Sequence, residues 1–553
     1  MASAINSNGG APVLVLNTIA ERESGRKAQK SNIEVAKSVS NLIRTCLGPQ
    51  AMMKMLLDPM NGITCTADGH AILREIDMAH PAAKTLLDLC RTQDEEVGDG
   101  TTSVIIIAGE ILAQTGSLLE KNFHPISIIN AYRKGLQEAI KTVSSLSQSI
   151  DIKSDQEMIE LIKGCLGTKI GARWSEMLCQ IALRAVNIVA KVNETHNEVD
   201  IKRYVRIEKI PGGSIEDSRL VNGVVINKDV LHSNMRRRIE NPRILLIDCS
   251  LEYKKGESMT NIEIVKEGDW NAFLALEEQQ IKEMCDKIIS HKPDIVICEK
   301  GVSDLAQHYL LKANITVFRR LKKTDNNRIA RACGATIVNQ VDEIREADIG
   351  TKCGLFHIEL ITNDYFAFFD ECREPKACSV ILRGPSKDIV NEIERNLHDC
   401  MFVVRNLFLN PSLVPGGGVL ETEIAINLEK IATITENAVE KYSFNALSRA
   451  FEIIPRTLIQ NSGSDATSLM IDLHAKHQIG GSYWGIDGIE GKLVEMQPGC
   501  GIWESTSVKL QTVKSAIEAA CMILRVDDIL SGLTRKENHS ASNDATVEDE
   551  NNE

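Results

Sequence analysis

The spacing of apolar residues predicts that the first part of the chain is mainly helical. Apolar positions recur at helical intervals from Asn32 to Cys46, and the predicted helix stops at Gly48-Pro49. A less regular apolar segment, Met52–Leu57, comes next, and a short strand is predicted at Ile63–Thr66. The residues after it, Ala67–Gly69, have the composition of a hairpin turn.

The middle of the chain alternates between strand and helix patterns. Helical patterns reach about Leu146 and resume over 155–195 with a break at Gly167-Thr168-Lys169, and the pattern changes after Lys209–Gly213. The segments beyond are predicted strands at Ile244–Ile247, Ile295–Cys298 and Thr316–Phe318, and predicted helices at Trp270–Ser290, Ser303–Lys312 and Asn327–Cys333. This alternation predicts a small α/β domain with parallel strand pairing. Its polar segment Leu251–Asp269 is a candidate projection.

The last third is predicted to return to helices. A long helix starts at Ser386, and its apolar stripe consists of Ile389, Ile393, Leu397, Cys400, Val404 and Leu407. A polar face lies beside this stripe and carries Glu392, Arg395, Asn396 and Asp399, so periodicity alone predicts that Asp399 is a solvated surface residue. Pro415–Gly418 opens another helix, and the acidic residues beyond about Ser531 are predicted to be disordered.

Composition restricts the class of protein. A chain of 553 residues is too long for one core and predicts two or three domains. The net charge of −13 argues against nucleic acid or an anionic membrane as a partner, and we find no apolar run of membrane-spanning length. Fifteen cysteines without Cys-x-x-Cys pairs, and without a signal peptide before them, predict reduced thiols in the cytoplasm.

Two pairs of neighbouring residues could in principle form a disulfide or a metal site, and neither is expected to. Cys372 and Cys378 are close enough in sequence to form a disulfide, but two free thiols are the expected state. His474 and His477 share a helix face, and because no third ligand lies near them in sequence we expect no metal site there.

The segment with the most specific chemistry is Arg91–Ser103, which runs into the apolar segment Val104–Leu112. The first turn of a helix presents free backbone N–H groups and the positive end of the helix dipole, so it is an anion site. Asp99 next to those amides is suited to hold a Mg²⁺ ion that also contacts phosphate oxygens. The alternative is that Asp99 is an ordinary helix N-cap, and this segment alone favours that alternative.

Two other phosphate motifs are excluded by the same residues. The sequence contains no Gly-x-x-x-x-Gly-Lys-Ser/Thr, so it is not a P-loop NTPase. A phosphotransferase loop of the type Asp-x-Asp-Gly-Thr needs aspartate where this chain has Val97.

An ordered set of motifs resembles the group II chaperonins over roughly Thr18–Leu530. The motifs are Leu47-Gly-Pro49, Thr66–Gly69, Gly98–Ser103, Glu394–Asp399, Val414–Gly418, and Gly501–Glu504 followed by Val508-Lys509. Three further segments are similar to one subunit type of the eukaryotic cytosolic chaperonin, CCT or TRiC, and these are Ser250–Ser258, Lys300–Tyr309 and Asp325–Arg331.

The resemblance implies a multidomain α and α/β protein with the chaperonin (GroEL-like) fold. A mainly helical equatorial domain would be built from both chain ends, an intermediate domain from two pieces, and an α/β apical domain would carry a helical protrusion that serves as a lid. The implied boundaries are 1–154 and 410–532 for the equatorial domain, 155–218 and 374–409 for the intermediate domain, 219–373 for the apical domain with its protrusion at about 251–280, and 533–553 for an acidic tail.

The resemblance also implies a function. Such a subunit would join seven paralogous subunits in an eight-membered ring, and two stacked rings would use ATP to enclose and fold non-native proteins such as actin and tubulin. Two other hypotheses remain open. One is a stand-alone metal-dependent ATPase, and the other is a ring subunit that acts structurally with weak or no ATP hydrolysis of its own.

Residue roles follow from the motif matches. Asp99 would bind Mg²⁺, while Asp399, assisted by Asp68, would orient the attacking water. The residues expected to bind ATP or ADP are Gly48, Gly100, Thr101, Thr102, Ser103, Thr168, Lys169, Gly417, Gly488, Glu504 and Lys509. The chain departs from the family pattern at Gln50, Ala67, Ala466 and Ser505, and the loss of the usual lysine at position 50 predicts weak ATP binding.

Overall fold

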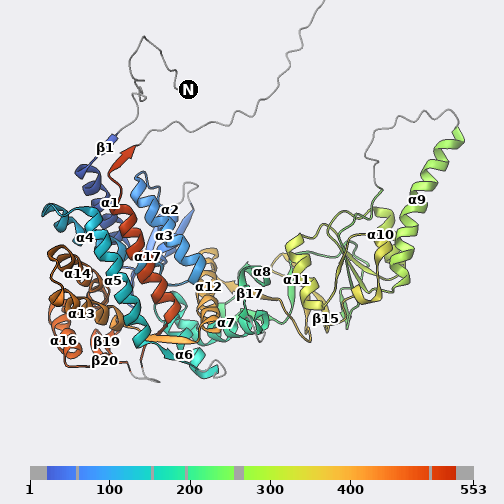
Figure 1. The fold of residues 1–553 in the computed structure, drawn as a ribbon. Coiled ribbons are helices and arrows are strands. Elements are labelled where there is room, and N and C mark those ends of the chain that lie inside the picture. Colours follow the sequence, from blue (N-terminus) through green and yellow to red (C-terminus); the bar gives the residue numbers. More distant parts are fainter. Residues whose placement is uncertain are drawn as a thin grey trace, which may run out of the picture.

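The computed structural model describes residues 22–57, 62–150, 155–192, 197–253, 267–496 and 501–530. Figure 1 shows an elongated molecule with a helical region at one end, an α/β region at the other, and a smaller middle region between them. Each region has a large buried apolar core of its own. The regions are therefore separate packing units, as expected for a chain of this length.

The helical region combines the two ends of the described chain. Its helices are α1 (Arg26–Arg44), α2 (Gly69–Glu75), α3 (Pro81–Val97), α4 (Thr101–Glu120), α5 (Pro125–Leu146), α13 (Val419–Ile434), α14 (Ala438–Phe451), α15 (Ile453–Asn461), α16 (Ala466–Gln478) and α17 (Thr506–Leu524). Its strands are β1 (Arg22–Ser24), β2 (Lys54–Leu57), β3 (Ile63–Thr66), β4 (Gln148–Ser149), β18 (Ser412–Pro415), β19 (Trp484–Asp487), β20 (Lys492–Glu495), β21 (Trp503–Ser505) and β22 (Asp528–Leu530). Antiparallel pairing of β1 with β22 joins the two ends.

Helix α4 occupies the centre of this region. It packs against α1, α14 and α17, and its apolar run Val104–Ala108 is fully buried. By length and composition it is also the one helix of the described chain that could cross a membrane. The sequence-based prediction that no apolar run reaches membrane-spanning length is therefore wrong for α4. The apolar character of α4 is explained by its place in the core.

The middle region contains segments from before and after the α/β region. Its helices are α6 (Asp155–Leu166), η1 (Ile170–Trp174), α7 (Ser175–Val189), α8 (Ile201–Tyr204), η2 (Ile215–Asp217) and α12 (Lys387–Leu409). Its strands are β5 (Lys191–Val192), β6 (Asn197–Glu198), β7 (Val205–Pro211), β8 (Arg219–Val221) and β17 (Cys378–Gly384), with β17 between β7 and β8 in one sheet. The predicted break at Gly167–Lys169 is confirmed, because it separates α6 from η1.

The α/β region confirms the predicted alternation. A parallel sheet is formed by β11 (Ile244–Ile247), β12 (Ile295–Cys298), β13 (Thr316–Phe318) and β14 (Ile337–Val338). A second, antiparallel sheet is formed by β9 (Val224–Ile226), β10 (Arg238–Glu240), β15 (Leu355–Ile361) and β16 (Asp364–Asp370). The helices are α9 (Glu267–Ser290), α10 (Asp304–Lys312), α11 (Lys323–Cys333), η3 (Val341–Glu343) and η4 (Glu346–Asp348). Most of the predicted projection Leu251–Asp269 lies outside the described residues.

One local prediction is wrong. Ala67–Gly69 does not close a hairpin, because Asp68 is the N-cap of α2 and accepts hydrogen bonds from the backbone N–H groups of His70 and Ala71. The antiparallel partner of β3 is instead β2, which precedes it. A turn-forming Asp-Gly pair and a helix N-cap use the same residue types, so composition alone does not separate them.

Candidate functional site

The sequence-predicted site residues come together in one cavity between the helical and middle regions. Its wall includes Gly48, Asp68, Asp99, Gly100, Thr101, Thr102, Ser103, Thr168, Lys169, Asp399, Gly417, Gly488, Glu504 and Lys509. These residues come from eight separate stretches of sequence, so their convergence is a property of the fold.

The N-terminus of α4 forms one wall of the cavity. Gly98 and Gly100 flank Asp99 with φ values of 69° and 78°, which few residues other than glycine adopt. Gly100 is the N-cap, and Val104 donates the first hydrogen bond of the helix to Gly100 O at 3.0 Å. The backbone N–H groups of the first turn therefore precede the helical hydrogen-bond ladder and can bind an anion.

Asp99 is not the N-cap of α4. Gly100 has that position, and among the described residues no side chain caps this helix. The Asp99 carboxylate accepts a hydrogen bond from Gly100 N–H at 2.8 Å, and its other oxygen lies 3.6 Å from the Cys165 thiol. The ordinary-cap interpretation is therefore wrong for Asp99.

Asp68 connects two helix starts at the cavity. It caps α2, as described above, and its Oδ1 also accepts a hydrogen bond from Thr101 Oγ1 at 2.9 Å. A cap of this kind contributes about 0.5–2 kcal/mol to stability. Asp68 therefore has a structural role in addition to its position in the cavity wall.

Asp399 is on α12 and points into the cavity rather than into solvent. Its side chain is only 15% exposed and forms an ion pair with Lys169, which is 17% exposed. The prediction of a solvated surface residue is therefore wrong. Burial raises the pKa of Asp399 well above its usual range, and the neighbouring Asp68 and Asp99 carboxylates raise it further, while Lys169 opposes the shift.

The acidic side chains of the cavity fit a magnesium site that uses one or two protein carboxylates. Asp68, Asp99 and Asp399 all influence this cavity electrostatically, whereas Lys169 is the cation beside them. Within the described residues, however, these carboxylates do not form a group whose oxygens lie within 4.8 Å of one another. A single ion would therefore take at most two of these carboxylates and complete its shell with phosphate oxygens and water, which is the usual coordination of Mg²⁺ in phosphate-binding sites.

Another part of the cavity wall belongs to a buried ion-pair network. Lys509 Nζ lies 2.8 Å from Glu421 Oε1 and 2.9 Å from Glu504 Oε2. Burial disfavours the ammonium group, but the two carboxylates outweigh this effect and raise the pKa of Lys509. Because the network has one more negative than positive charge, it is suited to accept hydrogen bonds from hydroxyl groups of a ligand.

Sequence reasoning did not assign several residues of the cavity wall to the site. Cys165, Glu392, Asn396 and Pro49 also line the cavity. Asn396 Nδ2 is one of the described polar atoms that are buried without a hydrogen-bond partner. The available signal was the spacing of Glu392, Asn396 and Asp399, which places them on one face of α12.

The two histidines have structural partners, as predicted. His474 Nε2 lies 3.3 Å from Glu452 Oε1, and His477 Nδ1 lies 2.8 Å from Glu423 Oε2. The other ring nitrogen of His477 lies 2.7 Å from the Trp484 carbonyl oxygen. These contacts hold α16 against its neighbours, and among the described residues neither histidine belongs to a potential metal-ligand group.

A family model and individual relatives both assign the sequence to the same protein family. Residues 39–532 match the TCP-1/cpn60 chaperonin family. The chain is 56% identical to T-complex protein 1 subunit gamma of Schizosaccharomyces pombe, with 95% of this chain and 99% of the relative covered. It is 56% identical to the protein of the same name from Saccharomyces cerevisiae, over 95% and 100% of the two chains, and 54% identical to the human one, over 96% and 97%.

Proposed function

The chain belongs to the TCP-1/cpn60 chaperonin family, and from this premise we propose that it is an ATP-dependent subunit of a hetero-oligomeric, double-ring chaperonin. Its partners would be seven paralogous subunits in each eight-membered ring, and its clients non-native proteins such as actin and tubulin in the cytoplasm. The observation that carries the ATP-dependent part is the convergence of the chaperonin-like motifs on one cavity at the open N-terminus of α4.

The domain division proposed from the sequence is supported by the three large cores. The helical region would be the equatorial domain, the middle region the intermediate domain, and the α/β region the apical domain. The cavity lies where the equatorial and intermediate domains meet, since α4 belongs to the first and α12 to the second. Movement between these domains would therefore change the distance between the site residues on α4 and those on α12.

The phosphate groups of ATP would bind at the first turn of α4. The backbone N–H groups of Thr101, Thr102 and Ser103 are at the positive end of the helix dipole, and these residues line the cavity. Mg²⁺, when bound, would neutralise charge on the phosphate oxygens, and Asp99 would be its protein ligand. Gly48 and Thr168 line the same cavity and would complete the phosphate-binding side.

Asp399 would orient and deprotonate the attacking water. It enters the cavity from α12, whereas the phosphate-binding turn belongs to α4. Burial makes its carboxylate a stronger base, and Lys169 holds the carboxylate in place. Asp68 would assist from the start of α2.

The sugar and base of the nucleotide would bind at the part of the wall that carries Gly417, Gly488 and Glu504. Gly417 and Gly488 provide close backbone approach, and Glu504, held by Lys509, would accept hydrogen bonds from ribose hydroxyl groups. Strand β18 places the Pro415–Gly418 segment next to β21, which carries Glu504. The two ends of the nucleotide would thus be bound by different parts of the helical region.

ATP hydrolysis would be coupled to the apical domain through α12. This helix directly follows β17, and β17 pairs with β7 and β8, which lead into the α/β region. A displacement of α12 when Asp399 approaches the nucleotide would therefore move the sheet at the base of the apical domain. Domain closure driven in this way would close the lid over a client.

Electron microscopy of particles isolated from native cytosol with a tagged copy tests the proposed assembly. A stacked double ring that contains the tagged chain is the expected result. Isolation of the tagged chain only as a monomer with ATPase activity would instead favour the stand-alone ATPase.

The alternative of a ring subunit with low turnover of its own is favoured by Gln50. Within the described chain Gln50 is exposed, and the cavity wall ends at its neighbour Pro49. A lysine here would place a cation at the cavity rim, where a charge-assisted hydrogen bond to phosphate contributes about 1.5–3 kcal/mol. Lys169 already supplies one cation inside the cavity. A second cation, from lysine at position 50, is therefore expected to contribute a free energy at the lower end of this range.

We expect Gln50→Lys to increase ATP affinity at this site by about tenfold. Nucleotide occupancy, determined site by site in ring structures at limiting ATP, measures the change. The exposed substitution Gln460→Lys, which lies away from the cavity wall, is the matched control for an added charge. Full occupancy of the unmodified site at the lowest ATP concentration that fills its neighbours would contradict weak binding.

Client contacts are expected on the α/β region around α10 and α11. Four exposed basic residues surround the start of α11, namely Arg319, Arg320, Lys322 and Lys323. Mixed polar surfaces of this kind favour selective binding of clients with complementary charge. Photo-crosslinks from a trapped client should therefore map to these helices, and crosslinks that fall mainly below residue 150 or above residue 420 would refute the assignment.

A further inference from the structure

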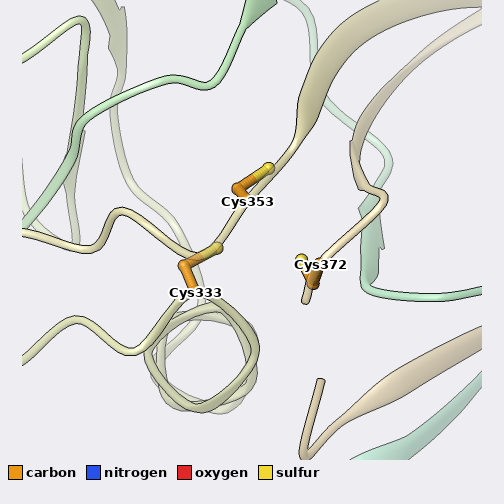
Figure 2. A group of neighbouring side chains, drawn as sticks. All are labelled: Cys333, Cys353 and Cys372. Atoms are coloured by element: carbon orange, nitrogen blue, oxygen red, sulfur yellow. The ribbon is translucent and has the colours of Figure 1, made fainter. Parts of the chain in front are cut away.

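Three cysteines from separate segments converge in the core of the α/β region. Cys333 is the last residue of α11, Cys353 precedes β15, and Cys372 follows β16. All three are buried free thiols, and their sulfur atoms lie within 4.8 Å of one another. Figure 2 shows the three side chains as neighbours on three separate segments of the chain. We call this group the cysteine triad.

The surrounding backbone holds the triad in place. Lys352 N–H donates to Cys333 O at 3.2 Å, and Cys372 N–H donates to Asn222 O at 3.1 Å. Gly223 leaves room for the side chain of Cys372, because a Cβ atom at position 223 would lie 3.2 Å from Cys372 Sγ and 1.9 Å from Phe369 O. The cysteines are thus fixed by three different parts of the fold and do not depend on a flexible loop.

The triad lies in an apolar core. Its three cysteines belong to the same buried cluster as Phe356 and Phe369. Three sulfur atoms within 4.8 Å of one another in these surroundings form a set of soft ligands for a cation.

We propose that the cysteine triad binds one thiophilic metal ion through its three sulfur atoms. Three soft ligands exclude Mg²⁺ and Ca²⁺, which take oxygen ligands. With a metal–sulfur distance of about 2.3 Å, trigonal ligands lie about 4 Å apart, so only a small contraction of the triad is required. Binding of the ion releases the thiol protons of the ligating cysteines to solvent and transfers no electrons.

The number of ligands favours Cu(I) over Zn²⁺. Structural zinc sites have four ligands, whereas among the described residues the group holds three, all buried. Cu(I) accepts soft thiolate ligands and does not require a fourth. A bound ion would fix the C-terminal end of α11 to the segments that flank β15 and β16. The proposal does not depend on ATP, because the triad lies in a different region from the nucleotide cavity.

The test is a metal titration of the reduced full-length chain under argon, with Cu(I) in one arm and Zn²⁺ in another, each against a competing chelator. We expect one Cu(I) per chain, bound more tightly than Zn²⁺. X-ray absorption on the loaded wild-type chain should show three sulfur ligands at about 2.3 Å. This measurement needs no variant, so a variant that fails to fold does not remove the test.

Variants assign the ion to the triad. Cys353→Ser and Cys372→Ser should each lower affinity by at least about a hundredfold, since even loss of an outer-shell partner typically costs 10–100-fold. Cys285→Ser is the matched control, because Cys285 is a buried free thiol in the same core but outside the triad. Equal affinity of all variants, fewer than three sulfur ligands, or a Cys353–Cys372 disulfide in protein kept under argon would overturn the proposal. A four-coordinate Zn²⁺ site would retain the triad as ligands but overturn the preference for Cu(I).

Discussion

Replacement of Asp399 by alanine is expected to leave ATP binding intact and to slow hydrolysis at this site by ~10²–10⁴-fold. The reason is that Asp399 enters the cavity from α12, while the phosphate-binding turn belongs to α4. Single-turnover kinetics with the other ring sites silenced, together with nucleotide titration, separates the rate from the affinity.

Two further variants identify the cause of the effect. Asp399→Asn keeps the size of the side chain and removes its charge, so it should reproduce the rate loss if the carboxylate acts as a base. Asp388→Ala removes an exposed carboxylate from the same helix outside the cavity wall and should leave turnover unchanged. Weakened ATP binding with full remaining turnover in Asp399→Ala would rule out the proposed role.

The variants of Asp399 also alter the ion pair with Lys169. Loss of the carboxylate leaves a mostly buried ammonium group without its partner, and breaking such pairs is often strongly destabilising. Thermal melting of the variant with and without ATP shows whether the folded fraction is maintained. Since the free ammonium can then contact phosphate oxygens, ATP should restore part of any lost stability.

Replacement of Asp99 by alanine should weaken Mg²⁺-ATP binding by about tenfold to a hundredfold. It removes the proposed hard ligand for the ion next to the first turn of α4. Nucleotide titration with and without Mg²⁺ is the measurement, and the loss of affinity should be confined to the Mg²⁺ condition.

A true helix cap provides the control for Asp99. Asp465 caps α16 by accepting a hydrogen bond from Thr467 N–H at 3.0 Å. Asp465→Ala should cost about 0.5–2 kcal/mol of stability and leave Mg²⁺-ATP affinity intact. If Asp99→Ala behaves in the same way as Asp465→Ala, Asp99 does not bind the ion.

The sequence by itself determined the features that depend on local spacing. Helical periodicity located α1 and α12, and alternating strand and helix patterns located the parallel sheet of β11, β12 and β13. The ordered motifs also selected the residues that line the cavity. These features were predictable because hydrogen bonding and side-chain periodicity within one element are set by neighbours in sequence.

Only the tertiary structure decided how polar faces are used. Periodicity placed Asp399 in solvent, because it shows which side of α12 is polar but not what packs against that side. The structure pairs Asp399 with Lys169 and turns this face toward the cavity, which makes Asp399 a mostly buried carboxylate. In the same way, α4 resembles a membrane span in composition and is a core helix by packing.

The cysteine triad depended entirely on the fold. Its members, Cys333, Cys353 and Cys372, are about twenty residues apart, and no short-range Cys-x-x-Cys pair marks them. The sequence indicated proximity only for Cys372 and Cys378, which are near neighbours along the chain. The group that forms in the core instead joins Cys372 to the two distant cysteines. Side chains from the end of a helix, a connecting segment and the end of a strand meet only after the sheets of the α/β region have packed. Spacing along the chain carries no information about such contacts, because they are determined by packing between elements and not by periodicity within one.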